Sequence, residues 1–459
     1  MANDNPAMAK NPEAPLLGKG MLLALFATVV ILRIPNVLLQ GRFFGEEGSY
    51  FFAYAWHMEW WEALFHPLGG YINVIASGGT LLARQLVGWG VIPLEAAPWV
   101  TSLIALAFQM LPAVLIITAR DAWLAPRLAK PAALALIAAA PMAHEVWLHS
   151  LHSQFHLTLC VALALACKVP ESRRGRALYL AILALAPLCG PAAIVFLPFF
   201  GLKALIERTR GRWAQVFALG IGAAVQMLVF YYPVMVRGHS FDPAMLSALL
   251  LVRQAVLPLA GPFAAKDAGF AIFQQLPTGG VGLTVVLASV LLFGALIVFA
   301  LRHWRQPAAW LVIPGLLLAC VSYFGAIATP AAMLLPLVGE RYSFVPNVLV
   351  GLSLIALAST TRGLGSRLFS ALVAIEVVVA VAFFSGPKAE MTEGPKWADE
   401  VAKWRADPTY KLEGWPSGWT VNLAPGSPRC PEVAGPADPE YCDGHWEERE
   451  KRSIAGMAQ

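Results

Sequence analysis

Charged residues are scarce in this chain of 459 residues: Asp, Glu, Lys and Arg make up 13% of it, whereas 58% of the residues are hydrophobic. A soluble domain needs more surface charge and less apolar sequence, so the composition excludes an ordinary soluble protein. It predicts instead an all-α protein that crosses a membrane many times. The net charge of +5 resides in short segments between apolar runs. We therefore expect membrane lipids, and not nucleic acid, as its surroundings.

We expect no cleavable signal at the start of this sequence, and no internal repeat of fixed period is apparent. The first residues, MANDNPAMAKNPEAPLLGKG, stay polar for too long before the first apolar run, and no small-residue cleavage site follows. We expect residues 1–19 to form a cytosolic arm that leads into a retained first span. Because no repeat of fixed period is present, the inverted-repeat architecture of many transporters is disfavoured.

Apolar runs that could cross ~30 Å of hydrocarbon predict about eleven transmembrane helices. They are Gly20–Leu39, Trp99–Ala119, Ala132–Val146, Phe155–Cys167, Ala177–Leu188, Ala192–Ile206, Trp213–Tyr232, Val281–Leu301, Ala308–Ile327, Tyr342–Ser359 and Leu368–Phe384. A further stretch, Tyr71–Ile92, contains Asn73, two adjacent glycines and Arg84. We expect it to lie on the outer membrane surface as a juxtamembrane helix.

The basic clusters support this assignment, because they then all fall on the cytosolic side. The clusters are Arg120/Arg127/Lys130, Lys168/Arg173/Arg174/Arg176, Lys203/Arg208/Arg210/Arg212, Arg302/Arg305 and Arg362/Arg367. The pattern predicts a transmembrane domain over residues 20–385, with its first periplasmic loop at 41–98. Residues 386–459, which are rich in Trp, Pro and charged residues, are predicted to form a small tail in the periplasm.

Only six cysteines are present, and four of them lie in apolar runs as packing residues. Cys430 and Cys442 lie in the tail, where an oxidising compartment favours a disulfide. A zinc site that includes His445 is the weaker alternative, because no fourth ligand is apparent.

The most informative stretch is Gly41–Gly70, which follows the first apolar run and carries Glu46 and Glu47 among many aromatic residues. Carboxylates at the membrane edge are costly and usually line a cavity or a reaction centre. A solvated loop with ordinary acids is the alternative. The aromatic residues could stack on a sugar, although belts of aromatics are common at membrane interfaces.

The order of three short motifs resembles the GT-C superfamily of membrane glycosyltransferases that use polyprenyl-phosphate sugars. After the acid pair, HPLGGYINVIASGGTLLARQLV is similar to a juxtamembrane helix of that superfamily. The stretch LAPLCGPAAIVFLPFF looks like the helical hairpin of aminoarabinose and protein-mannosyl transferases, and ERYSFVPNVLVGLSL looks like their Arg-Tyr motif. The resemblance covers most of residues 20–385.

This resemblance implies a bacterial inner-membrane enzyme that transfers one sugar, with inversion, from a polyprenyl-phosphate donor to a lipid or glycan acceptor in the periplasm. A sugar hydroxyl is a poor nucleophile, so a carboxylate must take its proton. Consecutive residues of an extended segment point to opposite sides, so Glu46 and Glu47 cannot share one role. The motif position favours Glu46 as the base and Glu47 as a supporting acid.

The leaving lipid phosphate needs positive charge more than it needs a proton, and a guanidinium can bind two of its oxygens at once. Arg341 and Tyr342 match the Arg-Tyr motif, and Arg84 lies on the expected juxtamembrane helix. Arg237 and Arg253 are further outer-side candidates. Each of these arginines could instead extend towards lipid headgroups.

Glu145, His149, His152 and His156 are spaced like metal ligands on one helical face. A turn between two spans must fall within this stretch, however, so a continuous helix is not expected. Members of the superfamily place an acid in this loop, where this chain has His152 and Gln154. The sequence therefore indicates no cofactor with certainty, and a divalent metal stays a doubtful alternative. Contacts of these residues and His149 with hydroxyl or phosphate groups, or packing at the interface, are the alternatives.

Two other classes of function fit a polytopic membrane protein. A lipid or sugar transporter or flippase would need alternating access in place of a base. A polysaccharide polymerase or ligase would need similar chemistry but a different acceptor. The sequence does not identify the sugar or the acceptor.

Overall fold

The computed structural model describes residues 18–230, 241–326, 328–386 and 389–424, and these form an all-α membrane protein with one short hairpin of strands. The predicted Arg237 and the Cys430–Cys442 disulfide lie outside the described residues. The helices up to residue 230 are α1 (Lys19–Arg33), α2 (Asn36–Gln40), α3 (Ala53–His57), α4 (Trp60–Phe65), α5 (Val74–Gly88), α6 (Ala97–Thr118), α7 (Ala129–Ala138), α8 (Ser153–Ala166), α9 (Arg173–Leu185), α10 (Leu197–Glu207) and α11 (Arg210–Phe230). The remaining elements are α12 (Pro243–Leu250), α13 (Leu257–Gly279), α14 (Leu283–Arg302), α15 (Pro307–Phe324), α16 (Glu340–Thr360), α17 (Leu364–Ala382), α18 (Ala389–Thr392), α19 (Trp397–Ala406), β1 (Leu412–Glu413) and β2 (Thr420–Val421).

Seven helical segments of the described chain are long and apolar enough to cross a membrane, so the predicted count of eleven is not confirmed. Five of the predicted runs form helices that are too short for this criterion: α1, α7, α8, α9 and α10. At 1.5 Å per residue, helices of 10 to 15 residues reach only about 15–22 Å. Helices α1 and α7 end before their predicted runs do, whereas the runs of α8 and α9 are themselves too short for a straight span.

One of the seven segments, Pro243–Pro277, is not among the predicted runs. Asp242 caps its first helix, α12, because its side chain accepts hydrogen bonds from the N–H groups of Ala244 and Met245. The backbone leaves helical geometry at Gly261, where φ is 88°. The second half then returns beside the first, so that a Cβ on Gly269 would lie 3.6 Å from the Val252 side chain. The segment is thus a bent hairpin.

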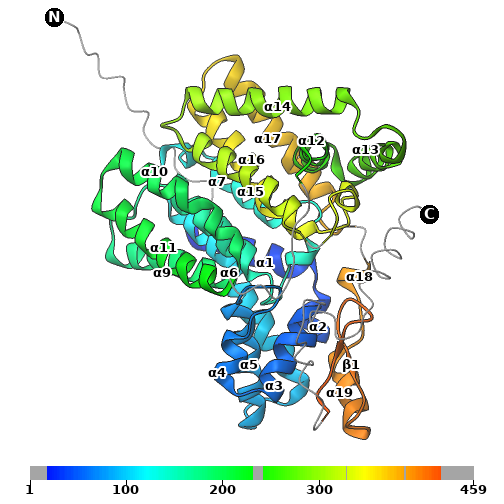
Figure 1. Ribbon diagram of the computed structural model, residues 1–459. Helices are drawn as coiled ribbons and strands as arrows, with labels where there is room; N and C mark the ends of the chain where they lie inside the picture. Colours follow the sequence, from blue (N-terminus) through cyan, green and yellow to red (C-terminus); the bar gives the residue numbers. More distant parts are fainter. Residues whose placement is uncertain (1–17, 231–240, 327, 387–388, 425–459) are drawn as a thin grey trace, which may run out of the picture.

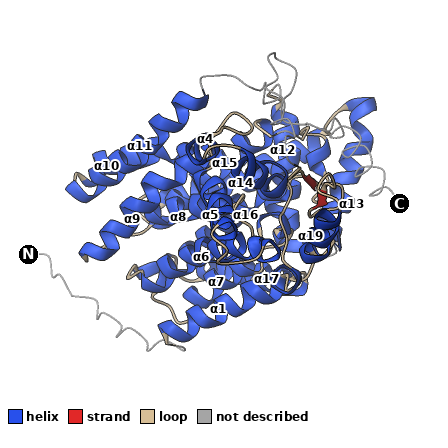
Figure 2. Cartoon of the chain, turned by 90° about the horizontal axis from the view of Figure 1, so that it is seen from below, coloured by secondary structure: helices blue, strands red, loops and turns tan. Residues whose placement is uncertain are grey.

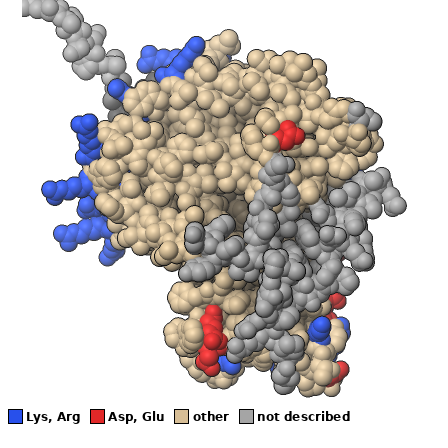
Figure 3. All heavy atoms as spheres, viewed as in Figure 1, with Lys and Arg blue, Asp and Glu red and all other residues tan. Residues whose placement is uncertain are grey.

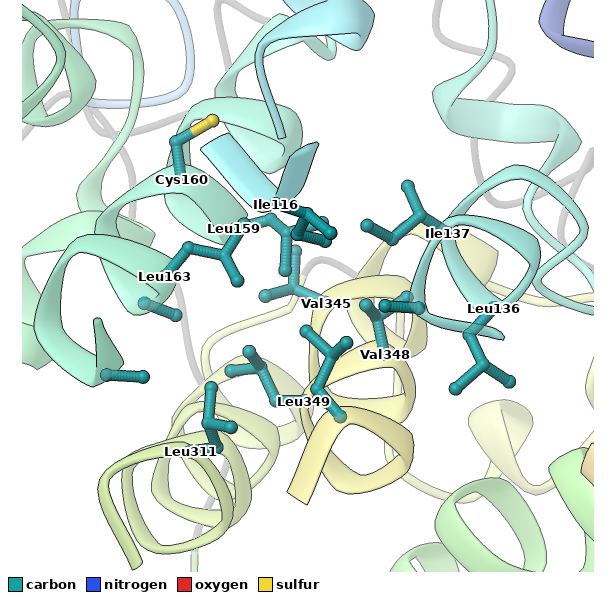
Figure 4. Packing of buried hydrophobic residues seen from close by; sticks show 14 of the residues in the cluster. Ile116, Leu136, Ile137, Leu159, Cys160, Leu163, Leu311, Val345, Val348 and Leu349 are labelled. Carbon is teal, nitrogen blue, oxygen red and sulfur yellow. The ribbon is translucent and has the colours of Figure 1, made fainter. Parts of the chain in front are cut away.

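Helix α16 is the centre of the body, because 83% of its most apolar window is buried. Figure 4 shows Val345, Val348 and Leu349 of α16 facing apolar side chains of its neighbours. These include Leu159 and Leu163 of α8, Ile116 of α6, Ile137 of α7 and Leu311 of α15. Glycine at position 351 permits close contact with α17, since a Cβ there would lie 2.6 Å from the Glu376 carboxylate.

Several basic connections meet at one end of the body, which we call the basic end. Residues after α6, between α8 and α9, between α10 and α11, and between α14 and α15 line one pocket of about 320 Å³. Figure 3 shows Lys and Arg gathered over the left side and the top of the molecule, with a broad band almost free of charge beside them. This grouping agrees with the prediction that the basic loops share one side.

Helices α3 to α5 form an extension below the body, and α18, α19 and β1 lie next to them (Figure 1). The segment Tyr71–Ile92, predicted to be a juxtamembrane helix, contains α5, which starts where the Asn73 side chain accepts a hydrogen bond from Ala76 N–H. Seen from below, the helices form a close bundle with the two short strands at its edge (Figure 2).

Candidate active site

A cavity of about 600 Å³ lies where the first outer loop meets the body. Its polar lining consists of Glu46, Tyr50, Tyr71, His152, Gln154, Ser322, Arg341 and Tyr342. The remaining lining is mainly apolar and comes from the 3₁₀ segment Pro191–Phe196, Pro198, α11 and α15. The cavity therefore combines polar and apolar walls, as a ligand with a charged head and a hydrocarbon tail requires.

Glu46 is half-buried on the cavity wall, at the start of a helical segment. The expectation of an extended segment was wrong, because Glu46 has helical backbone angles and Glu47–Phe52 form a π-helix. Gly45 before it has a φ of 50°, which glycine adopts without strain. The two adjacent carboxylates nevertheless point to different surroundings.

Glu47 is fully buried and does not line the cavity. Its Oε1 accepts hydrogen bonds of 2.6 Å from both the N–H and the hydroxyl of Ser150. Burial raises the pKa of Glu47, although the bonds from Ser150 and Phe44 and the charge of Arg42 oppose that effect. Its contacts connect the first outer loop to the loop between α7 and α8, which is a structural task.

Arg341 lies in the first turn of α16 and faces the cavity in contact with Glu145. The Glu145 carboxylate accepts a hydrogen bond of 3.0 Å from the Arg341 backbone N–H. It also forms a short ion pair with the Arg341 guanidinium. The guanidinium also donates to the Tyr342 hydroxyl at 3.3 Å and lies over that ring. Glu46 is close enough to act on Arg341 electrostatically.

His149 and His152 lie in the irregular segment before α8, and both rings bond to one atom, the carbonyl oxygen of Glu145, at 2.7 and 2.5 Å. A carbonyl oxygen only accepts, so His152 Nδ1 carries a proton and donates it. Burial, followed by the charge of Arg341, lowers the pKa of His152 to about 4. His152 is therefore neutral near pH 7, and its Nε2 is a hydrogen-bond acceptor on the cavity wall.

His149 does not line the cavity; its ring stacks on Phe44 at 4.3 Å, and burial lowers its pKa well below 6.5. His156 lies on α8, whereas His149 and His152 precede that helix. The three rings therefore do not lie on one continuous helical face. Across the described residues, no three side chains of His, Cys, Asp or Glu come together as a metal site.

Gln154 reaches the hairpin that the sequence motif singled out. Its amide nitrogen donates to the Tyr71 hydroxyl at 3.4 Å. Its Oε1 lies where a Cβ on Gly190 would stand, at 1.8 Å, so position 190 must be glycine for this contact to exist. Gly190 separates two 3₁₀ segments, Ala186–Cys189 and Pro191–Phe196, and thereby bends the hairpin into the cavity wall.

Two predicted arginines have other surroundings. Arg253 is fully buried and donates to Ser343 Oγ at 2.6 Å and to backbone carbonyls that include Leu335 O at 2.9 Å. It holds the loop before α16 and does not line the cavity. Arg84 lies 5.9 Å from the Trp56 ring on the outer extension, also away from the cavity lining.

The sequence did not assign Glu145 to the site, although its spacing to the histidines drew attention to it. Its partner Arg341 follows 196 residues later in the chain, and one sequence carries no signal for such a pairing. Tyr71 was missed for the same reason. Comparison with known protein families, with curated proteins and with solved structures finds no match.

Proposed function

We propose that this protein is an inverting glycosyltransferase of the bacterial inner membrane, which moves one sugar from a polyprenyl-phosphate donor to a lipid or glycan acceptor. The observation that carries the proposal is that Glu46 and Arg341, predicted as base and phosphate clamp, line one cavity. The apolar side chains that line the same cavity suit a polyprenyl chain, and the polar ones suit a phosphate and a sugar.

We assign the proton transfer and the stabilisation of the leaving group to two side chains of this cavity. The acceptor hydroxyl gives its proton to Glu46 while its oxygen attacks the anomeric carbon from the face opposite the phosphate. The bond between that carbon and the phosphate oxygen breaks, and its electron pair stays on the phosphate. Arg341 faces the increasing negative charge, which a guanidinium stabilises through two N–H groups.

His152 and Gln154 complete the proposed sugar site. Because His152 Nε2 is an acceptor, it suits a sugar hydroxyl and cannot donate to the phosphate. Gln154 carries both a donor and an acceptor. We assign these two residues to orienting the donor sugar.

The proposed orientation places the basic end in the cytosol, because basic loops are retained on that side. The amino terminus then lies in the cytosol, and the cavity and the carboxyl-terminal tail lie in the periplasm. A reporter that is active only in the cytosol, fused after residue 459, should stay silent.

The direct test uses the full chain in lipid nanodiscs with sugar donors built on undecaprenyl phosphate. Glu46→Gln should lower the rate of undecaprenyl phosphate release by roughly 10²–10⁴. Glu59→Gln is the matched control, because Glu59 is an exposed acid of the same loop and does not line the cavity. If Glu46→Gln still carried lipid across the bilayer, and neither it nor the unchanged chain released undecaprenyl phosphate, the protein would be a flippase and not a transferase.

A further inference from the structure

We infer that residues 389–424, which we call the C-terminal clamp, hold Glu46 in its position at the active site. This inference rests on the proposed function for the role of Glu46 but not for the contacts. The sequence indicated only a small appendage, whereas the structure docks this segment onto the loop that carries the acid.

The backbone of the clamp pairs with the backbone next to Glu46. Trp415 N–H donates to Phe43 O at 2.9 Å, and Gly45 N–H donates to Trp415 O at 2.5 Å. These two bonds form a bridge between Phe44 and Trp415. On the other side of Glu46, the Glu47 side chain is bound to Ser150. Glu46 thus lies between two fixed points, one of which the clamp provides.

The indole of Trp415 anchors this bridge to the rest of the C-terminal clamp. This side chain is 1% exposed, and its Nε1–H donates to Pro395 O at 2.8 Å. Its ring also lies 5.3 Å from the Arg42 guanidinium. Arg42 in turn donates to Met391 O in the clamp and to Trp147 O beside the histidine loop. One buried arginine therefore joins the clamp to both loops that build the cavity.

Two further contacts extend the docking surface. Trp397 is buried against Phe43, with ring centroids 4.9 Å apart, and donates to Leu94 O at 2.9 Å. Gly48 lies so close to the clamp that an added Cβ would be 2.8 Å from the Val421 side chain and 2.7 Å from Phe43. The consequence of these contacts is the position of residues 43–48.

Nothing in the clamp lines the cavity near Arg341. Loosening the C-terminal clamp should therefore displace the base, Glu46, and leave the position of Arg341 unchanged. Because a displacement of about 1 Å at a reacting group can cost about 100-fold in rate, the effect belongs in kcat and not in the KM for the lipid donor.

The experiment measures hydrogen exchange and turnover in the full chain in nanodiscs. Trp415→Ala should speed exchange in peptides covering residues 43–52 and leave α16 protected, and it should lower kcat about 10- to 100-fold with KM unchanged. Trp415→Phe keeps a ring and should recover most of the rate. Gly48→Ala perturbs the same interface from the other side, and the double variant should be no slower than the slower single variant.

Arg405→Gln is the control, because Arg405 pairs with Glu95 on the exposed rim of the same clamp. Unchanged exchange at residues 43–52 in both Trp415→Ala and Gly48→Ala would overturn the clamp. Faster exchange with an unchanged kcat would overturn its role in positioning Glu46. If Glu46→Gln itself turned over normally, the proposed function would fail, while the exchange data would still judge the clamp.

Discussion

The two ends of the helical body each contain an arginine beside a glutamate, but the two arginines are used differently. At the basic end, Arg212 makes five hydrogen bonds, to Glu207 twice, to Gln215 and to two backbone carbonyls. A guanidinium has five N–H groups, so Arg212 has none left for a ligand. At the cavity end, the side-chain contacts of Arg341 with described residues engage two of these groups, to Glu145 and Tyr342.

The difference shows how one residue type serves either stability or binding. Arg212 ties the connection between α10 and α11 to the end of α8, and every donor contributes to that task. Arg341 is held in place by Glu145, and we propose that its remaining N–H groups bind an anion. It faces a cavity nearly twice as large as the pocket at the basic end, about 600 against 320 Å³. Four predictions test this contrast, beginning with the largest expected effect.

Arg341→Ala should lower kcat by roughly 10²–10³, because it removes a donor aimed at charge that develops in the transition state. Arg341→Lys should keep part of the rate, since the charge remains but the two-point geometry is lost. Steady-state turnover of an undecaprenyl-phosphate sugar measures both. An increase in KM alone would mean that Arg341 only docks the donor.

Arg212→Met should lower the free energy of unfolding by about 1–3 kcal/mol, because buried carbonyls of Ala164 and Cys167 lose their donors. Thermal unfolding in detergent measures the loss, and kcat per folded molecule should not change. If Arg212→Met were as stable as the unchanged chain but had a lower kcat, the division of tasks between the two ends would be contradicted.

Glu145→Gln should lower kcat about tenfold, since Gln can still accept a hydrogen bond but no longer holds the Arg341 guanidinium as an ion pair. The freed charge should also bind the lipid phosphate more tightly, so KM should fall together with kcat. Binding of undecaprenyl phosphate by the variant provides the independent measurement. Weaker binding would show that Glu145 does not compete with the phosphate for Arg341.

The pH dependence of stability supplies the smallest effect. The pKa of His152 falls from 6.5 to about 4 on folding, so the unfolded state binds more protons between these values. Stability should therefore fall as the pH drops through this window and be fully present above pH 6.5. In His152→Asn, which can still donate to Glu145 O, Tm should fall less between pH 7 and 5 than in the unchanged chain. An equal fall in both proteins would assign the effect to other groups.

Much of the architecture could be predicted from the sequence, because hydropathy and basic loops are local properties. The apolar runs located most of the helices, and Asn73 and Asp242 act as helix caps. The predicted number of spans is not confirmed, since several apolar runs form short helices, and breaks such as Gly190 and Gly261 depend on how the hairpins pack. Hydropathy averages over such breaks and does not detect them.

The candidate site was predicted in part, for a similar reason. Glu46, Arg341, Tyr342, His152 and Gln154 were named from their local motifs and do line one cavity. Arg253 and Arg84 carried the same chemical signal but lie elsewhere. Whether an arginine faces a cavity or a set of backbone carbonyls depends on residues that are far away in the chain.

The sequence alone determined that this protein is helical, lies in a membrane and gathers its basic loops on one side, because these properties follow from the composition of each segment. Only the tertiary structure decided which of two adjacent glutamates faces the cavity, which carboxylate holds Arg341, and that residues 389–424 pack beside Glu46. Each of these depends on contacts between segments that are 100 to more than 300 residues apart, and such contacts are set by packing and not by local pattern.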